Sequence, residues 1–254
     1  MLKLYNLSKH YKTVKAVDDL SLEIQPGEVF GLLGANGAGK TTTLRMLSTM
    51  ISPTSGTATV GDYNICENPG EVRRSMGLLF GGDTGLYDRL TIRENILYFA
   101  KLNDVPEAKA KERVLELAQL LDFTEHLDKP ANKCSKGTRQ KGALARAIIH
   151  SPQVMLLDEP TIGLDITSRQ SVEDFIAACR ADGCTIVLSD HNLDLVESIC
   201  DRIAVIDQGQ LKGLGTVAEL AAQQGVATLK DVFFKLCEER KVENKKKGKK
   251  GGAA

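Results

Sequence analysis

The sequence predicts an α/β fold with a parallel β-sheet core, an antiparallel β-subdomain and an inserted α-helical subdomain. Three observations support this prediction. Residues 31–44, GLLGANGAGKTTTL, lead from an apolar strand through a glycine-rich turn into a helix. Continuous apolar runs at 154–157 and 185–188 are typical of strands buried on both faces. The pattern is mostly helical between about 88 and 152 and mostly strand-like on either side, which indicates an insertion.

The first strands precede the glycine-rich turn. Residues 2–24 alternate apolar and polar side chains, which predicts paired β-strands. We expect the polar turn between these strands at 9–15, with Tyr11 inside it. A tight turn is expected at 26–27, where a proline is followed by a glycine.

The later elements follow from the same patterns. Thr91 and Glu94 form a capping box that predicts the start of a helix. Pro106 is placed as the first residue of the next helix, and Ser135 is expected to cap a helix at 139–150. The other expected elements are strands at 57–60 and 76–80, helices at 172–179, 218–222 and 229–241, and a hairpin formed by 203–206 and 210–214.

The composition is that of a globular protein without a membrane span. The chain has 254 residues, of which 42% are hydrophobic, enough for one large or two small domains. No apolar run approaches the roughly 18 residues that cross a bilayer, and the first residues lack the apolar core of a secretion signal. We therefore expect a cytoplasmic protein, held peripherally on the cytoplasmic side of the cell membrane if a partner anchors it.

Charge is balanced overall but unevenly distributed. The 33 basic and 33 acidic residues cancel, yet six of the lysines lie within 241–254. The preceding part, 1–240, is therefore mildly acidic, which argues against a broad face that binds nucleic acid. We expect 1–240 to form the folded domain and the lysine- and glycine-rich 241–254 to be disordered.

The cysteines and histidines predict neither a disulfide framework nor a zinc site. No C-x-x-C pair occurs among the six cysteines, and the four histidines are scattered along the chain. We expect the cysteines to be free thiols in a reducing compartment.

The glycine-rich turn matches a phosphate-binding loop, the P-loop. Gly34, Gly39, Lys40 and Thr41 fit the pattern G-x-x-x-x-G-K-[ST]. Glycines let the backbone turn its N–H groups toward phosphate oxygens, and the following helix presents the positive end of its dipole. Lys40 would reach the β and γ phosphates, and the Thr41 hydroxyl would bind Mg²⁺. A glycine-rich turn that merely resembles the pattern is the alternative.

Two acids follow the apolar run at 154–157. Asp158 is expected to hold Mg²⁺, directly or through water, as an aspartate at this position does in P-loop ATPases. Glu159 can polarise or deprotonate the water that attacks the γ phosphate. The alternative is a pair of surface acids at the end of a strand.

The segment CSKGTRQ at 134–140 offers a second possible anion site. A capping Ser135, a glycine and a free helix N-terminus can bind an anion together, although a plain helix cap fits equally well. The segment resembles the signature loop of ATP-binding cassette (ABC) proteins, usually written L-S-G-G-Q. The resemblance covers about residues 1–235 in the family's order. It continues in ALARA at 143–147, VMLLDEP at 154–160, GLD at 163–165 and His191 after a strand.

This resemblance implies an ABC ATPase fold, a P-loop NTPase with a RecA-like core, and a role for each matching residue. Tyr11 resembles the aromatic residue that stacks on adenine, and His191 resembles the residue that contacts the γ phosphate and positions Glu159. Thr41 and Asp158 would hold Mg²⁺, and Glu159 would be the general base. The residues implied to bind the phosphates of ATP are Gly34, Asn36, Gly37, Gly39, Lys40, Thr41 and Thr42.

The resemblance also implies two kinds of partner. Ser135, Lys136 and Gly137 would cap the γ phosphate of ATP bound to a second copy of the chain, and Asp165 would lie in a loop that crosses between the copies. Two identical subunits would thus clamp two ATP molecules head to tail, and hydrolysis would reopen the dimer. A separate transmembrane permease would supply the transport path and dock at about 81–101. No nucleic-acid partner is expected.

The sequence departs from the family's pattern in the signature loop and at two other points. Lys136 replaces the first glycine of the signature and Thr138 its glutamine, and Ile162 replaces a frequent serine. The Lys136 side chain would either add positive charge toward the partner's nucleotide or point into solvent. Gly81 aligns with a glutamine that, in the family, responds to Mg²⁺ and couples the site to the membrane partner. We hypothesise that Asp83 replaces this glutamine, acting through water.

Residues 81–95 and 135–140 resemble the ATP-binding subunits of bacterial sodium-efflux systems of the ABC-2 export class. The expected function is therefore ATP-driven export, with sodium as cargo on this resemblance alone. Two alternatives remain: a soluble ABC ATPase acting on ribosomes or nucleic acid, and a nucleotide-binding regulator that hydrolyses ATP poorly because the glutamine is missing. The single P-loop, the absence of heptads and the acidic body weigh against the first, and Glu159 with His191 weighs against the second.

Overall fold

A computed structural model describes residues 1–81 and 85–237 of the chain. The expected disordered tail at 241–254 and the hypothetical role of Asp83 both lie outside these described residues. The boundaries expected for the folded domain and for its helical subdomain stay predictions.

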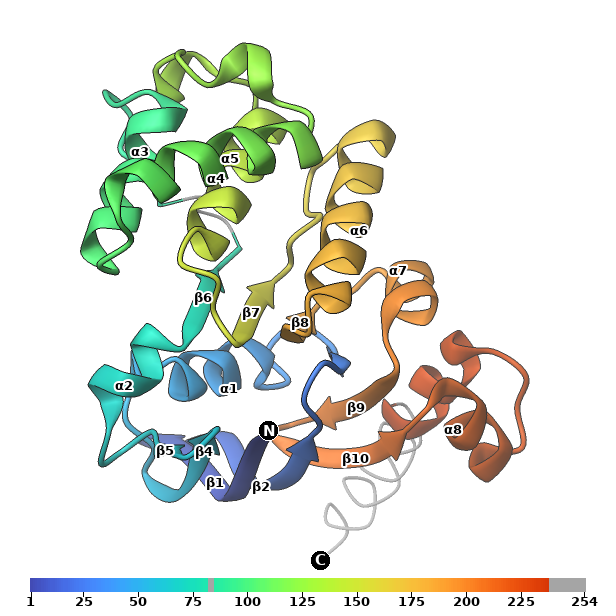
Figure 1. Ribbon diagram of the computed structural model, residues 1–254. Helices are drawn as coiled ribbons and strands as arrows, with labels where there is room; N and C mark the ends of the chain where they lie inside the picture. Colours follow the sequence, from blue (N-terminus) through green and yellow to red (C-terminus); the bar gives the residue numbers. More distant parts are fainter. Residues whose placement is uncertain (82–84, 238–254) are drawn as a thin grey trace, which may run out of the picture.

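The main sheet has six strands in the order β10-β9-β3-β8-β7-β6 (Figure 1). All neighbouring pairs are parallel except the β9–β10 pair, which is an antiparallel hairpin. The strands are β3 (Val29–Leu33), β6 (Met76–Leu79), β7 (Val154–Asp158), β8 (Thr185–Ser189), β9 (Arg202–Asp207) and β10 (Gln210–Gly215). Every residue of β3, β7 and β8 is buried, which agrees with the continuous apolar runs that predicted the last two.

A second, antiparallel sheet has the order β2-β1-β4-β5. Its strands are β1 (Leu2–Tyr11), β2 (Val14–Ile24), β4 (Ser55–Val60) and β5 (Tyr63–Asn64). The wide turn expected at 9–15 is wrong, because Tyr11 is the last residue of β1 and pairs with Val14. Only two residues make the turn, and Lys12 adopts a positive φ of 51° there. The polar side chains that suggested a turn belong to strand residues on an exposed face.

The α-helices cluster around the two sheets (Figure 1). They are α1 (Lys40–Leu47), α2 (Pro69–Arg74), α3 (Ile92–Leu102), α4 (Glu107–Leu120), α5 (Lys136–Ile148), α6 (Ile166–Ala181), α7 (Leu193–Ile199) and α8 (Val217–Gln224), with short 3₁₀ turns at Thr124–His126 and Ala131–Lys133. Residues 229–237 are also helical. The helix predicted at 172–179 begins earlier, since the Asp165 side chain caps α6.

The inserted helices α3, α4 and α5 pack together at one end of the molecule, opposite the antiparallel sheet (Figure 1). The capping box at Thr91 and Glu94 is present. Pro106 precedes α4 as its N-cap residue instead of opening the helix. Ser135 caps α5 as predicted, but the helix begins at Lys136, earlier than expected.

The main sheet separates two hydrophobic clusters. Along β7, Met155 and Leu157 join the cluster that includes α3 to α6, whereas Val154 and Leu156 join the cluster beneath the antiparallel sheet and α1. This alternation is what a strand covered on both faces requires. The segments that follow the carboxyl ends of β3, β7 and β8 carry the candidate site.

Candidate active site

The P-loop joins the end of β3 to the start of α1. Gly37 and Gly39 have φ values of 81° and 111°, a region that other residues rarely adopt. A Cβ atom at Gly39 would lie 2.4 Å from the carbonyl oxygen of Ala16, and one at Gly34 would lie 2.3 Å from that of Ile206. The glycines are therefore required by backbone conformation and by close contact with neighbouring strands. This tight loop is the cradle of backbone groups that phosphate binding needs.

Lys40 lies buried at the start of α1 inside this loop. Its ammonium donates hydrogen bonds to the carbonyl oxygens of Gly34 at 2.7 Å and Ala35 at 3.2 Å. Burial lowers the pKa of Lys40, and the carboxylates of Glu159 and Asp158 act in the opposite direction. The loop thus folds around a cation that an anionic ligand would neutralise.

Thr41 and Asp158 meet at the end of β7. The Thr41 hydroxyl donates a hydrogen bond to one Asp158 oxygen at 2.8 Å, and the Ser189 hydroxyl donates to the other. Within the described residues no cluster of three or more histidine, cysteine or acidic side chains could hold a metal ion. A hydroxyl beside one carboxylate still fits Mg²⁺, which takes one or two protein ligands and completes its shell with phosphate oxygens and water.

Glu159 follows Asp158 and faces His191. The carboxylate oxygen Oε1 of Glu159 lies 3.4 Å from Nδ1 of His191. Glu159 adopts a positive φ of 50°, and its backbone N–H donates to the carbonyl oxygen of Ser189 at 2.7 Å. A left-handed conformation in a residue other than glycine is costly, so the bond to β8 helps to hold the carboxylate out of the strand direction.

A buried pair behind these residues was not predicted from the sequence. Asp190 is 1% exposed, and its carboxylate accepts a hydrogen bond from the Thr161 hydroxyl at 2.9 Å. It also accepts bonds from the backbone N–H groups of His191 at 2.7 Å and Asn192 at 2.9 Å. Asp190 therefore ties the turn that carries His191 to the segment after Glu159. In the sequence, the available indication of this role was the position of Asp190 between a buried strand and His191.

The residues of the signature loop lie away from the P-loop of their own chain. Ser135 accepts a hydrogen bond from the backbone N–H of Thr138 at 3.1 Å and caps α5. A Cβ atom at Gly137 would lie 2.8 Å from the hydroxyl of Ser168, and one at Gly163 would lie 2.2 Å from the Lys136 ammonium. The loop therefore rests on the start of α6, and the Lys136 side chain lies over Gly163.

Asp165 lies beside this contact as the N-cap of α6. Its carboxylate accepts a hydrogen bond from the backbone N–H of Ser168 at 2.8 Å, which lowers the pKa of Asp165. The structure thus brings Ser135, Lys136, Gly137 and Asp165 into one group, separate from the group formed by Thr41, Asp158, Glu159 and His191.

Tyr11 and Gly81 lie on other segments, and the structure records a contact with the acids of the site for Gly81 only. The Tyr11 ring is 48% exposed at the end of β1, with the Lys9 ammonium 5.3 Å from its centre. Gly81 lies against the acids, since a Cβ atom there would be 3.0 Å from the carbonyl oxygen of Asp158 and 3.4 Å from Cβ of Glu159. A side chain at position 81 would therefore start directly beside the catalytic candidates.

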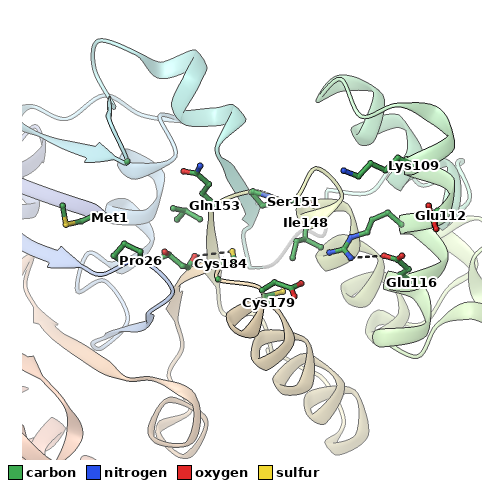
Figure 2. Close-up of a pocket in the computed structure, with 17 residues that line it drawn as sticks. Met1, Pro26, Lys109, Glu112, Glu116, Ile148, Ser151, Gln153, Cys179 and Cys184 are labelled. Carbon is green, nitrogen blue, oxygen red and sulfur yellow. Dashed lines mark hydrogen bonds and ion pairs between the residues drawn. The ribbon is translucent and has the colours of Figure 1, made fainter.

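A pocket of about 530 Å³ opens beside the P-loop and the candidate acid–base pair. Its lining residues are Leu33, Gly34, Ala35, Asn36, Glu159, Ile162, His191, Leu193, Phe233 and Phe234. A larger cavity of about 620 Å³ lies at the opposite, amino-terminal edge of the sheet, between the core and α4 (Figure 2). Burial raises the pKa of Cys179 there to about 12 and that of Cys184 to about 11, so both remain protonated thiols. The smaller pocket is therefore the one with groups suited to catalysis.

Known proteins share this fold and these motifs. The sequence profile of the ABC transporter family matches residues 17–162. The chain is 40% identical to the ABC transporter ATP-binding protein NatA of Bacillus subtilis over 92% of this chain and 97% of that protein. It is 33% identical to the linearmycin resistance ATP-binding protein LnrL of the same organism, over 90% of this chain and 73% of that protein.

Solved structures agree with the sequence relatives. The ATP-binding subunit of an ABC transporter superposes with a TM-score of 0.87 at 27% identity, covering 93% of this chain and 99% of that one. A dimeric ATP-binding cassette in a post-hydrolysis state, bound to ADP and Pi, superposes with a TM-score of 0.78 at 25% identity, covering 85% and 98%. The fold predicted from the sequence is confirmed, and the chain belongs to the ABC transporter family as one of its ATP-binding, ATP-hydrolysing subunits.

Proposed function

We propose that two copies of this chain close head to tail on two ATP molecules and drive export through a separate membrane permease. In each copy the P-loop from Gly34 to Thr42 binds the phosphates, and Tyr11 stacks on the adenine. Thr41 and Asp158 hold Mg²⁺, which neutralises charge on the phosphates when it is bound. The observation that carries this proposal is the convergence of Thr41, Asp158, Glu159 and His191 at one edge of the sheet.

Glu159 is the proposed general base. Its carboxylate can accept a proton from water, and the left-handed backbone at this residue directs the side chain away from Asp158. His191, 3.4 Å away, orients that carboxylate and contacts the γ phosphate. Asp190 and Thr161 are positioning residues, since their buried hydrogen bond fixes the turn before His191.

The need for a second copy follows from where the signature residues lie. Ser135 and Gly137 rest on α6 and do not line the pocket around Asn36, Glu159 and His191. The start of α5 therefore remains available to the ATP of another subunit. The dimeric cassette among the solved relatives supports this arrangement.

A membrane partner is proposed because the relatives are ATP-binding proteins of ABC transporters. Among the described residues, no helix is long and apolar enough to cross a bilayer. The chain would then be a peripheral protein on the cytoplasmic side of the membrane. The region proposed for docking, 81–101, displays exposed Tyr87 and Tyr98, whose rings pack edge to face at 5.5 Å. These rings line a shallow, mainly apolar hollow of about 490 Å³ with Leu90, a surface suited to a protein partner.

Replacing Glu159 with glutamine tests the ATPase and the dimer. We expect Glu159→Gln to lower ATP turnover by about 10²–10⁴-fold, measured as phosphate release, and to accumulate an ATP-bound dimer on a sizing column. Glu197→Gln on α7 changes an exposed acid outside the site and serves as the matched control. Unchanged turnover in Glu159→Gln, or a monomer with saturating ATP, contradicts the proposal.

The cargo needs a separate experiment. Sodium rests on the resemblance of 81–95 and 135–140 to sodium-efflux subunits, whereas the name of LnrL refers to linearmycin resistance. The chain and its permease would be reconstituted in vesicles that contain a sodium-sensitive dye. ATP-dependent sodium movement that stops in Glu159→Gln is the expected result. ATP turnover stimulated by the permease without sodium movement would exclude sodium and leave the ATPase assignment intact.

A further inference from the structure

An isoleucine at the start of α6 is exposed to an unusual degree. Ile166 is 86% exposed, more than any other large hydrophobic side chain in the described residues. It follows Asp165 directly, so it projects from the segment that contacts the signature loop. Ile162, four residues earlier, is 36% exposed. Two exposed apolar side chains therefore lie in the segment beside the signature loop.

A matching hollow lies on the same molecule. The 530 Å³ pocket beside the P-loop has an aromatic wall formed by Phe233 and Phe234 of the helical segment 229–237. Their ring centres lie 6.0 Å apart in an edge-to-face arrangement. Phe233 packs on the hydrophobic cluster of α3 to α6, whereas Phe234 is 41% exposed. The aromatic wall is therefore packed on the core at Phe233 and exposed to solvent at Phe234.

We propose that Ile166 of one copy inserts against Phe234 in the pocket of a second copy, and that the same contact is made in reverse. This inference rests on the head-to-tail dimer proposed above. A two-fold interface needs the projecting side chain and its receptor on one face of each subunit. That condition is met, because Ile162 lines the pocket and lies in the same loop that leads to Ile166.

The contacts of the signature loop explain why the occupant is a second copy. Gly137 lies against Ser168, and Lys136 lies over Gly163, so the signature loop and the start of α6 form one packed unit. A signature loop that reaches the ATP of another subunit therefore carries its own Ile166 toward that subunit. The receiving pocket contains Glu159 and His191, the groups beside which that ATP would be hydrolysed.

The C-terminal helix thereby becomes part of the dimer interface. Its Phe234 would be covered only when the second copy closes, so closure gains apolar burial outside the nucleotide itself. Loss of the Ile166 side chain is expected to weaken ATP-dependent dimerisation by about tenfold or more, because each dimer loses two buried side chains.

Cross-linking between two variants, each with one introduced cysteine, tests the contact directly. Both variants carry Glu159→Gln to retain ATP, and serine replaces the native cysteines that are not buried, Cys66, Cys134, Cys200 and Cys237. One adds Ile166→Cys and the other Phe234→Cys. With ATP and copper phenanthroline as oxidant, the mixture is expected to give a disulfide-linked dimer that neither variant gives alone. A dimer linked in the Ile166→Cys sample alone, or no linked dimer in a mixture that does dimerise, overturns the inference.

A second measurement separates this inference from the dimer itself. In the Glu159→Gln background, Ile166→Ser should weaken the ATP-dependent dimer in analytical ultracentrifugation while monomer affinity for ATP stays unchanged. The control is Leu115→Ser on α4, which removes an apolar side chain that is 45% exposed and lies outside the proposed contact. Equal dimer affinity in Ile166→Ser and the control refutes the Ile166 contact alone. Absence of any ATP-dependent dimer refutes the head-to-tail dimer instead.

Discussion

The starts of α1 and α5 are the two helix ends proposed to face the same kind of anion, but they are built differently. The start of α1 has no side-chain cap and follows the tightly turned Gly39. The start of α5 is capped by Ser135, which uses one of the free backbone donors. The first is a glycine-rich loop around a buried lysine, whereas the second is a single capped turn that does not line the pocket beside the P-loop.

The two helices share one property that most others in the described chain lack. Neither α1 nor α5 has an acidic residue in its first turn. By contrast, the first turns of α3 and α8 contain Glu94 and Glu219, which form capping boxes. A helix that supplies its own carboxylate neutralises its dipole and its free N–H groups. Helix starts without one remain available to an external anion, so this pattern links the two halves of the proposed site.

Lys40→Ala should give the largest difference between the two halves. We expect the affinity of the monomer for ATP to fall by about 10²-fold, since hydrogen bonds from a charged group contribute roughly 1.5–3 kcal/mol. Isothermal titration calorimetry measures the affinity. Lys136→Ala alters the lysine of the α5 half and should leave the affinity of the monomer for ATP unchanged. Equal losses in both variants would show that the halves do not act separately on the monomer.

Gly137→Ala addresses the α5 half alone. The new methyl group would lie 2.8 Å from the Ser168 hydroxyl, so the signature loop or the Ser168 side chain must shift. We expect ATP turnover to fall by about tenfold while ATP affinity of the monomer is kept. Adding Ser168→Ala removes the opposing hydroxyl and should restore part of the turnover. Gly70→Ala is the control, because an added Cβ atom there meets nothing within 4 Å. Full activity in Gly137→Ala would contradict the proposed role of this loop.

Thr161→Val tests the support behind the α1 half. It leaves a buried Asp190 oxygen without its hydroxyl partner, which should lower the free energy of unfolding by about 1–3 kcal/mol. Urea denaturation measures this loss, and Thr124→Val in the exposed 3₁₀ turn is the control. Turnover should fall as well, because His191 loses its fixed turn. A stability loss with unchanged turnover would restrict Thr161 to a structural role.

Asp165→Asn gives the smallest expected effect, a change in the free energy of unfolding that depends on pH. Its carboxylate caps α6, and the hydrogen bond from Ser168 lowers its pKa. A lowered pKa means that the charged cap stabilises the fold above the ordinary pKa of aspartate, and that this contribution disappears as pH falls through the lowered value. The stability difference between the native chain and Asp165→Asn should therefore shrink on acidification below about pH 4. A difference that stays constant from pH 7 to pH 3 would exclude the charge as its source.

Features that depend on neighbours in sequence could be predicted. The strands at β7 and β8 follow from uninterrupted apolar runs, and the caps at Thr91 and Ser135 follow from local side-chain spacing. The short α2 and α7 were missed, since six or seven residues give too little periodicity, although Pro69 and the capping Asn192 were available signals.

Features that depend on distant segments could not be predicted. The bond between Thr161 and Asp190 joins two loops after different strands, and only the parallel pairing of β7 with β8 brings them together. The same holds for Phe233 and Phe234, whose segment was expected as a terminal helix with no indication that it borders the P-loop. Motifs identified the chemical groups, but the order of strands determined what surrounds them.

The order of strands also bears on how the protein is synthesised. The strand that carries the P-loop, β3, lies between β8 and β9, and Val29 pairs with Ile186 while Gly31 pairs with Ile203. During translation the β3 segment leaves the ribosome long before either neighbour exists. Its backbone hydrogen bonds to neighbouring strands must wait for β8 and β9, more than 150 residues later. Such non-local pairing slows folding. A nascent chain stalled before β8 therefore contains the whole P-loop sequence but lacks the two strands that hold it in shape.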